Sequence, residues 1–312
     1  MTRVWPPANS RRLKSEIPGS VLSGGFSTSR FRLYLWVYAL LLCGVLVQFA
    51  LSDDLSFGRR PWENLQRTAS EFSWPSFLNV WYGNERLEFR SDDGTLLRVE
   101  NERASETRFL AGLAGAVWTT FKIATLGSFI AAMAALPFGL AAAKNLHLPW
   151  WLASSARAAL GMARSVHTLV FGLIFVGIIG LGPMAGVLAI AAHSFGTYGK
   201  LYAETIEAVD PRLMESGAAL GLSPLQTLVY GLGRLLLPQG LSVHLYIWEF
   251  NVRDSTVLGL IGAGGLGLLV SEAVSLFQWG RLATILLAII ALVAAFDALS
   301  RKIRHDIRSP QS

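Results

Sequence analysis

Long apolar runs alternate with polar segments along this chain, and their lengths indicate membrane-spanning helices. The first run, at residues 33–51, has no charged side chain, and at about 1.5 Å per helical residue it can cross a hydrocarbon core about 30 Å thick. Five later runs of similar character lie at residues 114–143, 166–181, 183–201, 236–261 and 282–299. The pattern predicts an all-α integral membrane fold with about six transmembrane helices.

The segment between the first two runs, residues 52–108, has a different composition. It contains eleven acidic residues and eight arginines, and none of its apolar stretches is long enough to span a membrane. Within it, residues 86–99 alternate between polar and apolar side chains on both sides of Asp93 and Gly94. Because Asp-Gly favours the tight turns of hairpins, we expect an extramembrane loop with a small β-hairpin at residues 86–99.

Composition supports a membrane protein, and the positions of the basic residues orient it. Apolar side chains make up 52% of the 312 residues and charged ones 15%, whereas about a quarter of the residues are charged in an ordinary soluble domain. The net charge is +6, but the basic residues gather at the ends of apolar runs rather than in a patch suited to nucleic acid. The positive-inside rule predicts cytoplasmic N and C termini and an external segment at residues 52–108.

These boundaries divide the chain into five parts. They are a basic cytoplasmic tail (1–32), a first transmembrane helix (33–51), an extracytoplasmic loop (52–108), a membrane core (109–303) and a cytoplasmic C-terminal tail (304–312).

A cytoplasmic loop at residues 202–235 interrupts the core with mixed polar and apolar residues. Pro211 separates one helical stretch from the next, and Gly221 followed by Ser223 and Pro224 predicts a turn and a new helix start. Two short helices with apolar faces need a partner protein, or they lie on the lipid surface.

Residues 258–267 read LGLIGAGGLG and contain the spacing G-x-G-x-x-G, which in dinucleotide-binding folds closes the backbone on a pyrophosphate. That fold needs a strand before the glycines and an acid about twenty residues after them. Here a membrane run precedes them, Glu272 is too near and Asp297 too far. We therefore predict a helix break or gate, with a nucleotide site as the alternative; the residues are Gly262, Gly264, Gly265 and Gly267.

Several polar groups fall within or next to the predicted spans, where each charge costs about 2.5 to 3.5 kcal/mol. Arg253 could contact an anion in a transport pathway, or it could only neutralise Glu249 one helical turn away. Asn251 could bind a neighbouring helix or an oxyanion. Arg164 and Ser165 begin the third span, where orientation alone explains an arginine and a role in substrate exit is the alternative.

The sequence offers no catalytic set. Cys43 is the one cysteine, the histidines are dispersed, and no G-K-[ST] loop is present, so neither a nucleophile nor a P-loop is indicated.

The loop at residues 202–235 resembles the coupling signature of permease subunits of ABC importers, E-A-A, three residues, G, nine residues, I-x-L-P. Glu215 and Gly221 match its two anchors at the right separation. Ser216 and Gly217 replace the two alanines, and the last part of the signature is absent.

The stretches around this loop look closely like the phosphonate-importer permeases of the PhnE type. The most specific part is Glu249, Asn251, Val252 and Arg253 followed by TVLGLIGAGGLG, and the resemblance covers residues 117–303. Thr168 stands where many relatives carry an acid.

This resemblance implies a type I importer permease in a bacterial inner membrane, passing phosphonate or a related phosphorus oxyanion such as phosphite, phosphate or a phosphate ester. It implies two permease chains, identical or related, with cytoplasmic ATPases that use the ATP and an external binding protein that delivers the solute. The chain itself would bind no cofactor. The ATPase contact would involve Glu207, Asp210, Glu215, Gly217 and Gly221. An ABC permease for another solute, a membrane enzyme with a nucleotide site, and a carrier that needs no ATPase are the alternatives.

Overall fold

The computed structural model describes residues 28–52, 60–85, 87–90, 96–231 and 233–308. The chain forms two units, Met1–Asn64 and Leu65–Ser312. In the first unit, α1 (Thr28–Leu51) is a helix of 24 residues, of which Phe31–Leu51 is long and apolar enough to cross a membrane. The helix begins five residues before the predicted run at 33–51, because polar residues that lead into an apolar run can continue its helix.

The segment predicted to be extramembrane is more helical than expected. It contains α2 (Pro61–Phe72), which begins at the end of the first unit, the 3-10 helix η1 (Ser76–Leu78) and α3 (Asn79–Tyr82). Two antiparallel strands follow, β1 (Leu87–Arg90) and β2 (Leu96–Glu100), with Leu87 opposite Glu100. β1 lies within the predicted hairpin range of 86–99 and β2 ends one residue beyond it, and the Asp93-Gly94 turn lies outside the described residues.

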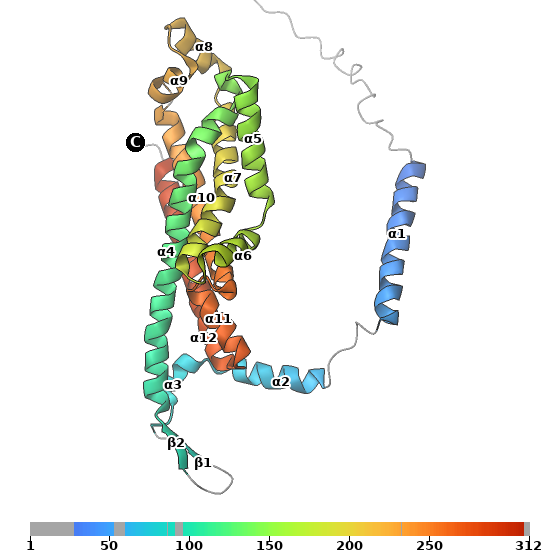
Figure 1. Cartoon of the computed structure of the whole chain (residues 1–312), viewed down its shortest axis with the longest axis vertical. Coiled ribbons are helices and arrows are strands. Elements are labelled where there is room, and N and C mark those ends of the chain that lie inside the picture. The colour runs from blue at the N-terminus through green and yellow to red at the C-terminus, as the bar shows by residue number, and fades with distance from the viewer. Residues whose placement is uncertain (1–27, 53–59, 86, 91–95, 232, 309–312) are drawn as a thin grey trace, which may run out of the picture. The chain divides into compact units, whose positions relative to one another are not determined.

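The long helix α4 (Glu102–Ala142) extends along the second unit, with β1 and β2 at one end and α8 and α9 at the other (Figure 1). Its start is fixed by Asn101, whose side chain accepts a hydrogen bond from the backbone N–H of Ala104 at 3.0 Å. With 41 residues it is about 60 Å long, about twice the thickness of a hydrocarbon core. A helix of this length projects beyond the membrane that it crosses.

A bent pair of helices follows the short 3-10 helix η2 (Lys144–Leu146). In this pair, α5 (Trp150–Ser165) and α6 (Thr168–Ile179) meet at 87°. The sequence analysis placed no apolar run between residues 143 and 166, because the arginines and serines of α5 keep its average hydropathy low. The next helix, α7 (Pro183–Glu207), is longer than the predicted run at 183–201.

The remaining elements are α8 (Pro211–Ala219), α9 (Pro224–Gln226), the π-helical turn η3 (Thr227–Gly231), α10 (Gly233–Leu258), the 3-10 turn η4 (Gly259–Ile261), α11 (Leu266–Ser275) and α12 (Trp279–Arg308). The last helix continues through residue 303, where the sequence analysis placed the end of the core, so α12 includes Arg304.

Several of these helices are long and apolar enough to cross a membrane. By length and apolar composition, three helices in the described part of the chain can cross, and up to five can if each bent pair forms one span. The predicted total of six also counts α7, and it stays a prediction.

Small residues bring the core helices together. A side-chain carbon at Gly127 of α4 would lie 2.8 Å from Cβ of Ile190 in α7, and one at Gly139 would lie 3.0 Å from the backbone oxygen of Gly199. Close packing of this kind replaces the hydrophobic effect as the force between helices in lipid. It sets the positions of α4 and α7 relative to each other.

Candidate functional site

The loop between α7 and α10 has a fixed shape. Asp210 caps α8 by accepting a hydrogen bond from the backbone N–H of Arg212 at 2.9 Å, and Pro211 occupies the first helical position. At the other end of α8, Gly221 has φ +76°, and the backbone N–H of Leu222 donates to the carbonyl of Gly217 at 3.1 Å. Such left-handed helix ends favour glycine, so Gly221 is needed for its backbone conformation.

A second turn begins directly after this one. The Ser223 hydroxyl accepts from the backbone N–H of Gln226 at 3.3 Å, and the Gln226 side chain accepts from the backbone N–H of Ser223 at 2.9 Å. This reciprocal cap starts α9. The loop is therefore two capped helices rather than a flexible connection.

Gly217 explains one departure from the coupling signature, in which an alanine stands at this position. The residue is buried, and a side-chain carbon there would lie 2.8 Å from Cβ of Thr227. Glycine thus lets α8 pack on the turn η3 that leads into α10.

Two acidic residues of this loop have opposite environments. Glu207, at the end of α7, accepts a hydrogen bond from the backbone N–H of Lys144 at 3.0 Å, and the side chain of Asn145 donates to the carbonyl of Ile206 at 2.9 Å. These contacts attach the loop to the end of α4. Glu215 is exposed on α8, and among the described residues it has no ion-pair partner, which leaves its carboxylate available to another protein.

The charges predicted on α10 form a group that includes a residue from α12. Glu249 is 9% exposed; its carboxylate accepts from Arg253 at 2.7 Å and from Arg304 at 3.4 Å. The Arg253 side chain is 52% exposed. The spacing of four residues predicted the first contact, whereas nothing in the sequence pattern pointed to Arg304, which comes 55 positions later.

Both polar atoms of the Asn251 amide are hydrogen-bonded inside the protein. The residue is 1% exposed, accepts from the hydroxyl of Ser194 at 2.9 Å, and donates to the hydroxyl of Ser128 at 2.8 Å. These bonds join α10 to α7 and α4. Asn251 therefore holds three helices together, which is the helix contact that the sequence left open beside an oxyanion contact.

A further polar contact joins α10 to α6 and was not predicted. The hydroxyl of Thr168 donates to the Asp254 carboxylate at 2.7 Å. Because Thr168 is buried, this bond fixes the start of α6 beside the charged part of α10.

The glycine-rich segment forms a break between α10 and α11, with a bend of 42°. Gly262, Gly264 and Gly265 have φ values of +96°, +84° and +70°, which L side chains rarely adopt. A side-chain carbon at Gly267 would lie 2.7 Å from Cα of Gly259. A helix precedes the glycines where a dinucleotide site requires a strand, so the spacing serves the turn and the close packing around it.

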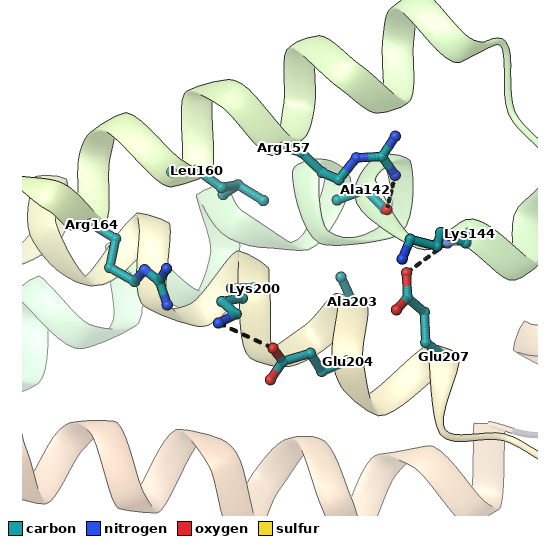
Figure 2. A pocket seen from close by; sticks show the side chains of 10 residues that line it. Ala142, Lys144, Arg157, Leu160, Arg164, Lys200, Ala203, Glu204 and Glu207 are labelled. Carbon is teal, nitrogen blue, oxygen red and sulfur yellow. Dashed lines mark hydrogen bonds and ion pairs between the residues drawn. The ribbon is translucent and has the colours of Figure 1, made fainter. Parts of the chain in front are cut away.

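Arg164 and Ser165 end α5 rather than begin a span. The Ser165 hydroxyl donates to the carbonyl of Met162 at 2.8 Å, within its own helix. Arg164 lines a cavity of about 260 Å³ between α5 and α7, where its guanidinium points toward Lys200 (Figure 2).

Known proteins are similar to this chain in sequence and in fold. Residues 135–309 match the family described as the binding-protein-dependent transport system inner membrane component. The phosphite transport system permease protein PtxC of Stutzerimonas stutzeri is 38% identical over 189 residues, which cover 61% of this chain and 69% of PtxC. The phosphate-import permease protein PhnE of Mycolicibacterium smegmatis is 31% identical over 191 residues, 61% of this chain and 36% of that protein.

Among solved structures, a chain of the MetNI methionine ABC transporter in an inward facing conformation has the same fold. The TM-score is 0.59 at 18% identity, over 65% of this chain and 99% of that one. In ABC importers of this family, a partner subunit hydrolyses ATP and a separate protein binds the solute. The matched family covers more than half of the chain, so this protein belongs to the inner membrane components of binding-protein-dependent transport systems: it is a multi-pass permease subunit of an ABC transporter and not an enzyme.

Proposed function

We propose that this permease passes a phosphorus oxyanion, such as phosphite, phosphonate or phosphate, toward the cytoplasm. The main support for the proposal is a shared carboxylate. Glu249 of α10 accepts hydrogen bonds from two guanidiniums, that of Arg253 on the same helix and that of Arg304 on α12. The two guanidiniums share this one carboxylate, while the neighbouring carboxylate of Asp254 accepts from the hydroxyl of Thr168. The names of PtxC and PhnE agree with an anionic phosphorus substrate.

Arg253 is the group suited to contact the anion. Arg253 donates to Glu249 through one nitrogen, Nη2. A guanidinium has five N–H donors in a planar fork that matches phosphate oxygens. Because its side chain is 52% exposed, the remaining donors can reach a ligand. For Arg164 and Ser165, at the end of α5, we propose a role in substrate exit from the same pathway.

The same exposure argues for a second permease chain. A charged side chain facing lipid near the bilayer centre costs about 2.5 to 3.5 kcal/mol, and Arg253 retains unused donors despite its contact with Glu249. A pathway shared with a second copy or a related chain would give Arg253 water and polar neighbours. The break at Gly262, Gly264 and Gly265 would then be the flexible gate on one side of this pathway.

The orientation follows from the coupling loop. We place α8, α9 and both chain termini in the cytoplasm and residues 52–108 outside, because the exposed Glu215 needs a cytoplasmic ATPase as its partner. In this arrangement Glu207 anchors the loop, whereas Asp210, Gly217 and Gly221 shape the face that carries Glu215.

The test compares Arg253→Gln with a matched control. Arg301 forms the same four-residue pair with Asp297 on α12, so Arg301→Gln removes an equivalent charge pair elsewhere in the core. Each variant is reconstituted with its ATPase and binding protein, and uptake of phosphite, phosphonate and phosphate into vesicles is measured. We expect Arg253→Gln to lower uptake at least about tenfold, since a charge-assisted hydrogen bond is worth about 1.5 to 3 kcal/mol, and Arg253→Lys to recover part of it.

Two results would contradict the proposal. One is equal uptake by Arg253→Gln and Arg301→Gln. The other is ATPase stimulation by a binding protein loaded with an uncharged or cationic solute, with none by the phosphorus anions, which would keep the permease but change its substrate.

A further inference from the structure

The cavity between α5 and α7 is a distinct feature with its own chemistry. Its lining includes Glu207, the last residue of α7, and Figure 2 shows the lining side chains. Its charged lining residues are Lys144, Arg157, Arg164, Lys200, Glu204 and Glu207.

Four cations thus face two carboxylates, and both carboxylates are already engaged. Glu204 pairs with Lys200 at 3.3 Å in the same helix. Glu207 accepts from the backbone N–H of Lys144, a bond that leaves the Lys144 ammonium unused. The cavity therefore has an excess of positive charge that the described residues do not neutralise.

Arg157 and Arg164 both have guanidinium N–H groups that donate no hydrogen bond to the described residues. Arg157 donates through Nη1 to the backbone carbonyl of Ala142 at 3.0 Å, and its other N–H groups have no acceptor among the described residues. Arg164 has no hydrogen-bond acceptor among the described residues, and its guanidinium points toward the ammonium of Lys200. Two like charges directed at one space repel each other unless an anion lies between them.

The walls of the cavity are fixed before any ligand arrives. A side-chain carbon at Gly196 of α7 would lie 2.6 Å from the backbone nitrogen of Arg164, and one at Gly199 would lie 2.8 Å from Cδ1 of Leu160. These glycines hold α5 close to α7 at one side of the cavity. Buried Ala142, Leu160 and Ala203 form an apolar floor, against which a charge interaction is stronger than in open water.

We propose that this cavity binds a phosphate-bearing anion. Its volume of about 260 Å³ accommodates a phosphate group, and guanidiniums with ammonium groups beside them are the side chains that recognise phosphate best. The group can come from an anionic lipid or from a free oxyanion. Trp150 and Trp151 begin α5 and are 81% and 61% exposed, as is typical of side chains at the level of lipid headgroups.

The cavity can bind such an anion whichever solute the permease transports. A lipid headgroup in the cavity would couple membrane composition to the position of α7, whose last residue, Glu207, precedes the coupling loop. A free phosphorus anion would bind after release from the pathway. Both sources share the same ligand atoms and differ in how they are delivered.

The experiment uses the full chain in complex with its ATPase, purified in a neutral detergent. In one arm, thermal stability is measured with inorganic phosphate against chloride at equal ionic strength. In the other arm, native mass spectrometry counts bound phosphatidylglycerol against phosphatidylcholine. The variants are Arg157→Gln and Arg164→Gln, alone and combined, and the control is Arg108→Gln, whose exposed side chain donates to the Ala104 carbonyl of its own helix.

We expect one or both arms to show specific binding that each single variant weakens roughly tenfold or more, and that Arg108→Gln leaves unchanged. Binding in the phosphate arm identifies a free anion, and binding in the phosphatidylglycerol arm identifies a lipid. Retained binding in Arg164→Lys separates a lost charge from a damaged fold. The proposal is overturned if neither phosphate nor phosphatidylglycerol binds more tightly than its control, or if the combined variant binds as the unmodified protein does.

Discussion

Gly221 offers the cleanest perturbation of the coupling loop. It has φ +76°, and a side-chain carbon built on it would meet no atom within 4 Å. Gly221→Ala therefore changes the backbone preference of one residue without a steric collision. The left-handed conformation costs an L-residue about 1 to 2 kcal/mol, and this is the whole expected effect.

The free-energy cost at Gly221 weakens two backbone hydrogen bonds of the turn. The backbone N–H of Gly221 donates to Ala218 at 2.9 Å, and that of Leu222 donates to Gly217 at 3.1 Å. A local cost of about 1 to 2 kcal/mol corresponds to roughly a 5- to 30-fold larger open population of the turn. Amide hydrogen exchange in a peptide covering residues 217–223 should accelerate by the same factor, while exchange in α10 stays unchanged.

Function is measured on the same variants. In the complex with ATPase and loaded binding protein, Gly221→Ala should lower the ATPase activity stimulated by solute, because the face that carries Glu215 loses its fixed shape. Gly221→Asn should recover much of it, since asparagine tolerates the left-handed region. The control is Gly112→Ala, which adds a carbon in open space within α4 and should be neutral or stabilising.

Either of two results would contradict the requirement for a left-handed backbone conformation at Gly221. Exchange of residues 217–223 in Gly221→Ala could stay within twofold of the unmodified protein. Alternatively, Gly221→Asn could be as defective as Gly221→Ala, which would mean that lack of space and not backbone conformation requires glycine.

Three further substitutions test other contacts by thermal unfolding in detergent. Arg281→Met removes the partner, at 2.9 Å, of the buried Glu106 carboxylate and should destabilise by about 3 kcal/mol; a loss below about 1 kcal/mol would show that water replaces the arginine. Gly267→Ala forces α11 away from η4 and should cost about 1 to 3 kcal/mol, whereas Gly177→Ala, with open space around it, should cost much less. Asn251→Leu breaks its bonds to two serines and should cost about 1 to 2 kcal/mol at about 0.6 kcal/mol or more per bond; no change would remove its role in joining three helices.

The apolar runs predicted the positions of helices well where one run corresponds to one helix. Residues 183–201 and 282–299 lie inside α7 and α12, and both helices extend beyond the runs at their polar ends. Hydropathy could not predict α5, because its apolar residues share the helix with Arg157 and Arg164 and the average falls. It also could not predict the 87° bend after Ser165, which depends on tertiary packing.

In the candidate site, contacts between residues close in sequence could be predicted, whereas contacts between distant segments could not. The pair of Glu249 and Arg253 follows from a spacing of four on a helix, and the turn at Gly221 follows from its residue type. The contact of Glu249 with Arg304 and that of Thr168 with Asp254 join segments far apart in sequence. No periodicity encodes such a pair, so it becomes visible only once the helices are packed.

These contacts also indicate how the coupling loop can act on the pathway. Gly217 packs on Thr227 in η3, and η3 leads into α10, which is continuous from Gly233 to Leu258. Glu249 lies sixteen residues along this helix, about 24 Å from its start at 1.5 Å per residue. Since a helix transmits displacement better than a loop, a shift of α8 would move Glu249 and the charges bound to it. The glycine break after Leu258 is a point at which the backbone can absorb that movement, Pro238 inside α10 being another, and we propose the gate at the glycine break.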